Sequence, residues 1–298
     1  MIGTQRVVRL GGGRRATVEI IGDGPPMLWF EGGPGFPARL SRPDAELLRD
    51  RFAVHLIDPH GSGGSTPPID SSHYSHLGHA RFYEEVRHAL GLGPVTIAGI
   101  SFGGSVALAY TALYPAATLR CIATSAGGFG AEADDGGEAA AEMERMLARH
   151  AGAAWYPEAR KAWDEWTDRV LAATDPAQVA QMFRAVFPLY CAHPDRPDVK
   201  ARLEWASSQL DIDLAALKAW EAGLYQTYDL RPLLPQIIRP TLTVCGELDL
   251  ICGPAQARPI ASAVNGASLI VIPDCGHIPA WEAPLQFREA VLDWCEAN

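Results

Sequence analysis

The segment from 95 to 113 constrains the fold more strongly than any other part of the chain. An apolar run, Val95-Thr96-Ile97-Ala98, leads directly into Gly99-Ile100-Ser101-Phe102-Gly103, and a helix-forming run rich in Ala, Val and Leu follows. A serine between glycines, at the junction of a strand and a helix, is typical of a tight elbow that holds the hydroxyl out at the end of the strand. The glycines are needed because the serine backbone is strained and neighbouring side chains would collide. Ser101 is therefore the first candidate nucleophile.

Strand and helix patterns alternate on both sides of this elbow. The chain begins with a predicted hairpin over 6–21, whose turn is the glycine triplet 11–13. Further strands are predicted over 27–30, 53–57, 95–98, 119–124, 241–245 and 268–272. Helical patterns lie between and after them, over 44–51, 79–90, 101–113, 255–264 and 284–296. This alternation predicts an α/β fold, with a mostly parallel, doubly wound sheet and helices on both of its faces.

The alternation is interrupted once, for about a hundred residues. Residues 129–235 carry only helical patterns, such as 138–150, 158–173 and 214–228. We therefore expect a core domain made of residues 1–128 and 236–298, with a helical cap inserted at 129–235. The cap tryptophans are expected to form mainly the cap's own core, with one or two of them at the substrate pocket: Trp155, Trp163, Trp166 and Trp220.

The charge of the chain argues against two classes of partner. Its 298 residues carry a formal net charge of −10 without a basic cluster, so neither nucleic acid nor an anionic membrane is expected to bind. No apolar run approaches the roughly 20 residues of a membrane helix, and the N-terminus lacks a signal-peptide pattern. The six cysteines are dispersed, which is typical of buried thiols. We expect a cytoplasmic protein that acts on a small molecule or a short peptide.

Two other loops that follow predicted strands carry the side chains that a nucleophilic serine needs. Serine is activated by a base of suitable pKa, usually histidine, and a carboxylate orients that histidine. Asp249 and His277 each follow a predicted strand. Because the carboxyl ends of parallel strands meet at one edge of a sheet, we expect Ser101, Asp249 and His277 to form a catalytic triad there. Glu247 is the competing candidate for the acid.

The loop after the strand at 27–30 is expected to complete the site. Its sequence, Glu31-Gly32-Gly33-Pro34-Gly35, contains glycines that let backbone N–H groups approach a ligand closely. We expect the N–H groups of Gly33 and Phe102 to form an oxyanion hole, in which one donor is worth about 3 kcal/mol to a developing negative charge. This chemistry requires no metal and no organic cofactor.

A histidine group elsewhere has the spacing of a metal site but not its context. His73, His76 and His79 follow a proline-rich loop, and no acidic residue is interleaved with them. A solvated start of a helix is the expected interpretation, rather than a metal site.

With these residues identified, the chain resembles the α/β-hydrolases, and within them the proline iminopeptidase-like group. Gly32-Gly33-Pro34-Gly35 matches the core of that group's oxyanion loop, and the segment from Asp58 to Ser65 is similar to its Asp-x-x-Gly-x-Gly-x-Ser loop. The resemblance covers nearly the whole chain, with least support in the cap. It implies that Ser101, Asp249 and His277 are the family's triad.

The chain departs from that group at three positions. Glu31 stands where the group usually has histidine, and Phe102 where the peptidases usually have tryptophan. The peptidases also carry a cap glutamate, which binds the free amine of the substrate, after a Trp-x-x-Trp pair. The similar stretch here ends Glu165-Trp166-Thr167, with Thr167 at the glutamate position, and Glu165 or Asp168 could substitute. Glu31, Glu165, Trp166 and Thr167 are therefore the candidate substrate-binding residues.

These residues predict a serine hydrolase that cleaves a small acyl substrate through an acyl-enzyme. The resemblance implies an aminopeptidase or amidase. A carboxylesterase or lactonase, or a C–C bond hydrolase of the same fold, shares the triad and stays an alternative. A hypothesis of another class is a non-catalytic receptor that binds a ligand on a hydrolase scaffold.

Overall fold

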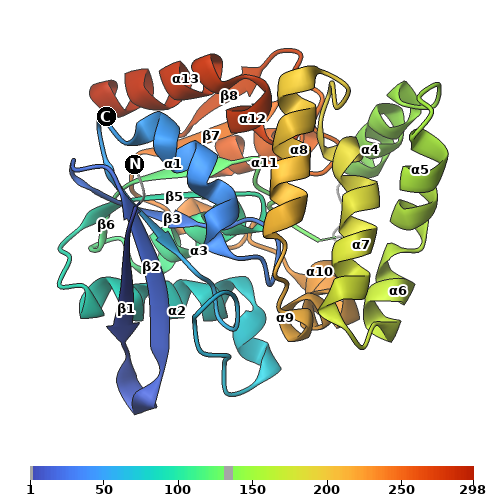
Figure 1. Cartoon of the computed structure of the whole chain (residues 1–298). Helices are drawn as coiled ribbons and strands as arrows, with labels where there is room; N and C mark the ends of the chain where they lie inside the picture. Colours follow the sequence, from blue (N-terminus) through green and yellow to red (C-terminus); the bar gives the residue numbers. More distant parts are fainter. Residues whose placement is uncertain (1–2, 131–136) are drawn as a thin grey trace.

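A twisted sheet lies at the centre of the computed structural model, which describes residues 3–130 and 137–298 (Figure 1). Its strands are β1 (Thr4–Arg9), β2 (Arg15–Ile21), β3 (Pro26–Phe30), β4 (Ala53–Ile57), β5 (Val95–Ile100), β6 (Thr118–Thr124), β7 (Thr241–Gly246) and β8 (Ser268–Ile272). Their order is β1-β2-β4-β3-β5-β6-β7-β8. β2 pairs antiparallel with both β1 and β4. All the other neighbouring strands, from β4 across β3 to β8, pair parallel. The predicted fold class, a mostly parallel doubly wound sheet, is confirmed.

Helices cover both faces of the sheet because alternate residues of each strand point to opposite sides. In β3, Met27 and Trp29 belong to one buried apolar cluster, and Leu28 and Phe30 belong to another. The first cluster is completed by α1 (Arg42–Leu48) and α13 (Pro284–Ala297). The second is completed by α2 (His76–Ala89), α3 (Phe102–Leu113) and α11 (Pro254–Ala263). The two clusters are the two halves of the core.

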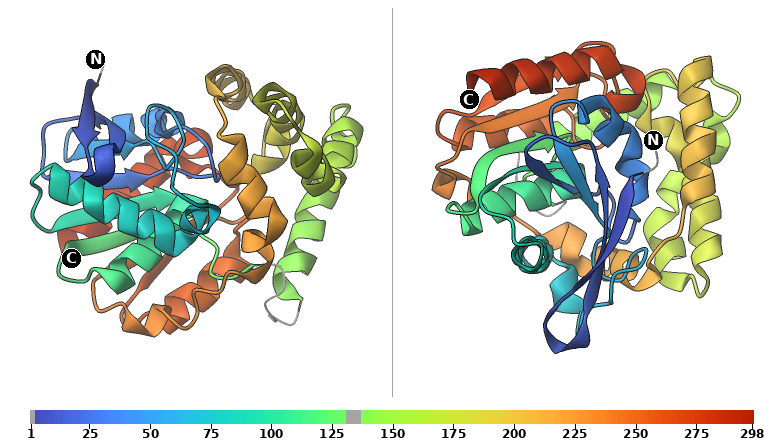
Figure 2. Two further views of the ribbon diagram at one scale, coloured as in Figure 1. Left: turned by 90° about the horizontal axis from the view of Figure 1, so that it is seen from below. Right: turned by 60° about the vertical axis from the view of Figure 1, so that its left-hand side comes forward.

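The long helical stretch lies between β6 and β7 and stands beside the sheet, away from the β1–β2 hairpin (Figures 1 and 2). Its helices are α4 (Glu138–Arg149), α5 (Tyr156–Asp164), α6 (Trp166–Ala172), α7 (Pro176–Val186), α8 (Pro197–Gln209), α9 (Leu214–Ala219) and α10 (Tyr225–Thr227). We call the described residues 137–235 the helical insertion. Two predicted helices are wrong in detail: the helix over 158–173 is broken at Glu165, and a π-helical turn at Trp220–Leu224 interrupts the one over 214–228. π-turns of this kind occur frequently at functional sites.

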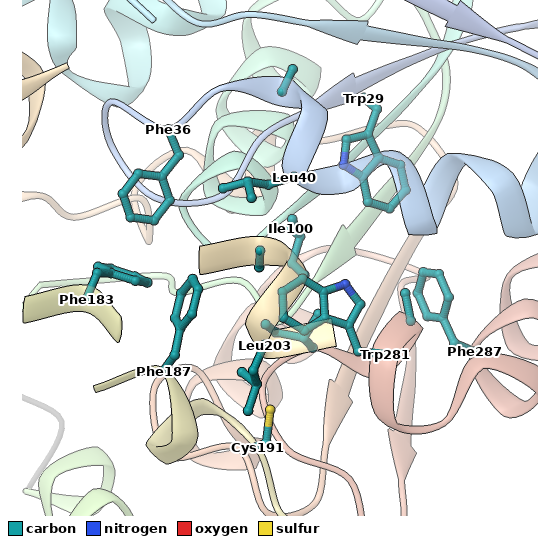
Figure 3. Packing of buried hydrophobic residues seen from close by; sticks show 14 of the residues in the cluster. Trp29, Phe36, Leu40, Ile100, Phe183, Phe187, Cys191, Leu203, Trp281 and Phe287 are labelled. Atoms are coloured by element: carbon teal, nitrogen blue, oxygen red, sulfur yellow. The ribbon is translucent and has the colours of Figure 1, made fainter. Parts of the chain in front are cut away.

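Aromatic contacts join the insertion to the sheet side of the molecule. Phe183 of α7 packs edge-on against Phe36, in the loop after β3, with ring centroids 4.6 Å apart, and against Phe187 at 4.4 Å. Figure 3 shows Phe36 beside Leu40, and Phe183 and Phe187 in the same cluster. The first core cluster is thus continuous from the sheet into the insertion, so burial of these rings ties the two parts together.

The elbow between β5 and α3 depends on its glycines. A Cβ atom on Gly103 would lie 2.2 Å from the carbonyl oxygen of Phe30, and one on Gly99 would lie 2.4 Å from that of Gly103. These are backbone contacts, so a side chain could be accommodated only by moving β3 or α3. The elbow therefore holds the end of β5 against the end of β3.

We predict that Gly103→Ala destabilises the protein through this clash. The free energy of unfolding should fall by about 1 to 3 kcal/mol, which is typical of overpacking at a rigid position. Gly93→Ala is the control, because a Cβ there meets no atom within 4 Å, and its effect should stay within about 0.5 kcal/mol. Urea denaturation followed by circular dichroism measures both. Equal stability of the two variants would contradict the prediction.

Candidate active site

Ser101 occupies a strained turn at the carboxyl end of β5. Its φ of 55° and ψ of −125° lie outside the usual regions for a residue with a side chain. The backbone on both sides holds this conformation: the N–H of Ser101 donates to the carbonyl of Thr124 at 2.9 Å, and the N–H of Ser105 donates to the carbonyl of Ser101 at 3.0 Å. The side chain of Ser101 is partly exposed to the cavity described below.

Asp249 and His277 meet at the neighbouring strand ends. Nδ1 of His277 lies 2.9 Å from both carboxylate oxygens of Asp249. Asp249 is buried, and its Oδ1 also accepts hydrogen bonds from the N–H groups of Ile251 and Cys252. The carboxylate of Asp249, held by these two N–H groups, accepts a hydrogen bond from Nδ1 of His277 and so orients the imidazole with its proton on Nδ1. Glu247, the competing acid, is exposed and accepts from the N–H of Asp274.

The other ring nitrogen of His277 is left available. Nε2 is buried and has no hydrogen-bond partner among the described residues, and His277 lines the same cavity as Ser101. With Nδ1 donating to Asp249, Nε2 carries the lone pair of the neutral ring. The pair thus presents a base to the cavity that the serine also faces.

Glu282, which sequence analysis did not single out, holds the histidine loop in place. Its two carboxylate oxygens accept from the N–H of Ala192 at 2.6 Å and from the N–H of Gly276 at 3.0 Å. The N–H of His277 itself donates to the carbonyl of Tyr190 at 2.7 Å. Burial raises the pKa of Glu282 to about 7. These bonds connect the loop of His277 to the insertion, so the base and the insertion are positioned together.

A cavity of about 390 Å³ lies between the sheet edge and the insertion. Ser101, His277, Gly33 and Phe102 all line it. Gly33 has a φ of +68°, and a Cβ on the preceding Gly32 would lie 3.2 Å from the Cβ of Ser101. The glycine loop therefore approaches the serine closely, which is the arrangement that an oxyanion hole requires. Most of the remaining lining is aromatic or aliphatic.

Three acidic side chains line the cavity, and no Lys or Arg does among the residues that the structure describes there. They are Glu31, Asp44 and Glu221. Glu31 is buried and accepts from the N–H of Gly32 at 2.8 Å and from the N–H of Ser41 at 3.1 Å. Burial raises the pKa of Glu31 well above its usual range, and the nearby Asp44 adds to the rise. The departure from histidine at this position thus places a buried carboxyl group beside the oxyanion loop.

Glu221 lies in the π-helical turn on the insertion side of the cavity. Its Oε1 accepts from Nε1 of Trp166 at 2.9 Å and its Oε2 from the hydroxyl of Thr167 at 2.7 Å. Both partners are uncharged, and the residue is only 7% exposed. Sequence analysis missed Glu221 because it lies 54 residues after Thr167, and only the folded insertion brings the two together.

The candidate substrate-binding residues divide into two groups. Glu31, Trp166 and Thr167 line the cavity. Glu165 does not: it lies at the break between α5 and α6 and pairs with Arg169 at 3.6 Å. The sequence predicts that the cap tryptophans form mainly the cap's core, with one or two at the pocket. Instead, Trp163, Trp166 and Trp220 line the cavity. These three and Trp155 are all only partly buried.

The expectation of a solvated helix start at the three histidines is wrong for two of them. His76 and His79 are buried against the ring of Phe102, with centroids 4.7 and 5.3 Å away. Burial lowers the pKa of His76 to about 3 and that of His79 well below its usual range, so both are neutral at physiological pH. The sequence held one indication of this burial: His76 and His79 are three positions apart, which places both on one face of a helix. No group of three or more His, Cys, Asp or Glu within 3–130 and 137–298 is arranged to hold a metal ion.

A family model described as the alpha/beta hydrolase fold matches residues 25–284. The chain belongs to this family. One relative, a 2-hydroxy-6-oxononadienedioate/2-hydroxy-6-oxononatrienedioate hydrolase of Klebsiella pneumoniae, is 25% identical over 95% of this chain and 88% of its own length. A proline iminopeptidase of Lactobacillus delbrueckii is 23% identical over 91% of this chain and 90% of its own length.

Solved structures agree with this assignment. The enol-lactonase of Burkholderia xenovorans superposes with a TM-score of 0.74 at 21% identity, covering 98% of this chain and all of its own. At this identity the likeness concerns the fold. Taken with the family match, the chain is an enzyme, a hydrolase of the serine type. None of the described helices combines the length and the apolar character that a membrane span requires.

We predict that a fluorophosphonate probe labels Ser101, because the elbow exposes this hydroxyl to a cavity shared with a histidine–carboxylate pair. Ser101→Ala should abolish the adduct, as detected by intact-protein mass spectrometry. Ser105→Ala is the control: the Ser105 hydroxyl is buried, donates to the carbonyls of Gly127 at 2.7 Å and Ser101 at 3.3 Å and accepts from the N–H of Gly127, and labelling should persist. An adduct on another residue in the folded protein would exclude Ser101 as the nucleophile.

The burial of Asp44 predicts a pH dependence of stability. Burial raises the pKa of Asp44 from 3.8 to about 7, so the folded state binds its proton more tightly than the unfolded state does. This contribution stabilises the fold at low pH and is lost as the pH rises from about 4 to about 7. Because one pKa unit corresponds to 1.36 kcal/mol, the loss is roughly 4 kcal/mol.

Asp44→Asn removes this titration. The free energy of unfolding of the variant minus that of wild type should therefore increase by several kcal/mol between pH 4.5 and pH 8, as measured in denaturant titrations. The exposed Asp293→Asn supplies the baseline. A difference between Asp44→Asn and wild type that does not change with pH would show that Asp44 titrates normally.

Proposed function

We propose that the protein hydrolyses amides or esters of small acyl groups that carry a free amine, by an acyl-enzyme mechanism of the aminopeptidase type. In this mechanism Ser101 is the nucleophile, His277 the general base and acid, and Asp249 the group that orients His277. The contact between His277 and Asp249 and the shared cavity support these roles.

The first half of the reaction forms the acyl-enzyme. Oγ of Ser101 attacks the substrate carbonyl carbon while Nε2 of His277 takes the hydroxyl proton. The N–H groups of Gly33 and Phe102 donate to the oxyanion of the tetrahedral intermediate. When the intermediate collapses, the bond to the leaving group breaks, and His277 returns the proton to the departing amine or alcohol.

The second half uses water in the place of the serine. His277 removes a proton from water, and the resulting hydroxide attacks the ester of Ser101. The same oxyanion donors stabilise the second intermediate. Collapse releases the carboxylic acid, and the proton on His277 returns to Oγ of Ser101, which restores the free enzyme.

Glu221 is the observation that carries the choice of substrate. It is a buried carboxylate on the cavity wall, and the two partners that its oxygens have are uncharged donors. A buried carboxylate is stabilised best by a cation, and the cavity lining contributes none from the described residues. A substrate ammonium group supplies that cation. The same lining disfavours a dianionic substrate, because three acidic side chains line the cavity and no Lys or Arg does among the described residues.

Ester cleavage is the second candidate, and the aromatic lining favours it. Rings from the sheet side and the insertion surround the serine, as in a site for an apolar acyl group. The triad can cleave both bonds, so only the leaving group distinguishes them.

The test uses a matched set of substrates: the alanine p-nitroanilide, the alanine p-nitrophenyl ester and their N-acetylated forms. We expect cleavage of the free-amine substrates, with a large loss of kcat/KM on acetylation. If N-acetyl substrates are cleaved as well as free-amine ones, the amine requirement is wrong. Cleavage of esters alone would leave the esterase alternative.

We predict that Glu221→Gln lowers kcat/KM for free-amine substrates by about 10- to 100-fold, which corresponds to a lost charge-assisted hydrogen bond of roughly 1.5 to 3 kcal/mol. Glu165→Gln, outside the cavity lining, is the matched control and should change kcat/KM by less than about twofold. Equal effects of the two substitutions would contradict the role of Glu221. A ligand-binding receptor, by contrast, would bind these amines without turnover in wild type.

A further inference from the structure

A second acidic subsite lies in the same cavity, on the sheet side. It is formed by Glu31, at the end of β3, and Asp44, in the first turn of α1. α1 packs against the short helix α12 (Pro279–Glu282), which carries Trp281. Glu221 lies instead in the turn between α9 and α10, which Figure 1 shows in the lower part of the view, whereas α1 and α12 lie in the upper part.

Two polar atoms of this subsite lack a partner. Oδ1 of Asp44 is buried without a hydrogen bond among the described residues, and Asp44 is only 2% exposed. Nε1 of Trp281 is also buried without a partner, and Trp281 is 6% exposed. Both side chains line the cavity. Because buried polar atoms are nearly always hydrogen-bonded, an acceptor and a donor left open on the same cavity wall point to a ligand that supplies the missing bonds.

The surroundings of Asp44 leave its charge without a contacting cation. The nearby carboxyl group is that of Glu31, whose pKa is raised by burial and further by Asp44. Arg202, on α8, acts on Asp44 only through space, and it does not line the cavity. The charged groups on the packed elements have other partners: Arg42 pairs with Glu19, Arg288 with Asp50, and Glu282 with the N–H groups of Ala192 and Gly276.

We propose that Glu31 and Asp44 bind a second cationic group of the substrate, an ammonium or guanidinium on the side chain of the acyl group, and that Trp281 donates to a neighbouring acceptor of the same substrate. This inference rests on the proposed function, because it assumes that the amine held by Glu221 belongs to the same molecule. The enzyme then prefers acyl groups with a basic side chain over apolar ones of equal length.

Binding of such a cation has a proton signature. Burial holds the pKa of Asp44 at about 7, so part of the free enzyme carries a proton there at neutral pH. A cation between the two carboxyl groups favours their ionised forms and expels that proton. A neutral hydrogen-bonding group would instead keep the proton on the acid, and its affinity would fall as the pH rises.

The experiment compares L-lysinamide with L-norleucinamide, which has the same four-carbon side chain without the terminal ammonium. Isothermal titration calorimetry on Ser101→Ala avoids hydrolysis, and two buffers of different ionisation enthalpy give the number of protons released. We expect lysinamide to bind at least about tenfold more tightly at pH 7, with net proton release. When Asp44→Asn is added to Ser101→Ala, the ratio of the affinity for lysinamide to that for norleucinamide should fall below about threefold.

The outcomes separate the two proposals. Equal affinities, or proton uptake with lysinamide, would overturn the second subsite and leave the amine site at Glu221 standing. Failure of both amides to bind would contradict the amine requirement itself and this inference with it. The proton count is measured without a substitution at Asp44, so it remains decisive even if Asp44→Asn alters folding.

Discussion

The close approach of two backbones at the elbow is the constraint on which the rest of the site depends. Gly99 and Gly103 let β5 turn into α3 while the helix start rests against the carbonyl oxygens of Phe30 and Glu31 at the end of β3. This contact brings the glycine loop beside Ser101 and strains the serine backbone at a φ of 55°. The energy of that strain is balanced by the packing of the parallel sheet on both sides. Ser101 and the glycine loop are therefore positioned by one feature.

The histidine is positioned by a different set of contacts. Its loop is bonded to the insertion through the carbonyl of Tyr190 and the carboxyl group of Glu282, and to the loop after β7 through Asp249. The position of His277 thus depends on the insertion, whereas that of Ser101 depends on the sheet. The cavity between these two parts is therefore lined by residues of both, and the position of His277 depends on both.

Much of the fold could be predicted because it follows from local periodicity. The short apolar strands, the helical patterns between them and the glycines at 99 and 103 are visible in the sequence, and their alternation indicates a mostly parallel sheet. The candidates Ser101, Asp249 and His277 were accessible for the same reason, since each ends a predicted strand. The break at Glu165 and the π-turn at Trp220–Leu224 were not, because a helical pattern does not show where one residue leaves it.

The sequence by itself determined the sheet, the elbow and the reaction type that a serine, a histidine and a carboxylate can perform. Only the tertiary structure decided which side chains surround the substrate. Glu221 meets Trp166 and Thr167 across more than fifty residues of chain, and the fold buries Asp44 where it acts on Glu31. The physical reason is that burial depends on the fold: an acid in water is an ordinary surface charge, whereas burial in an apolar cavity disfavours its charged form, as it does for Glu31 and Asp44.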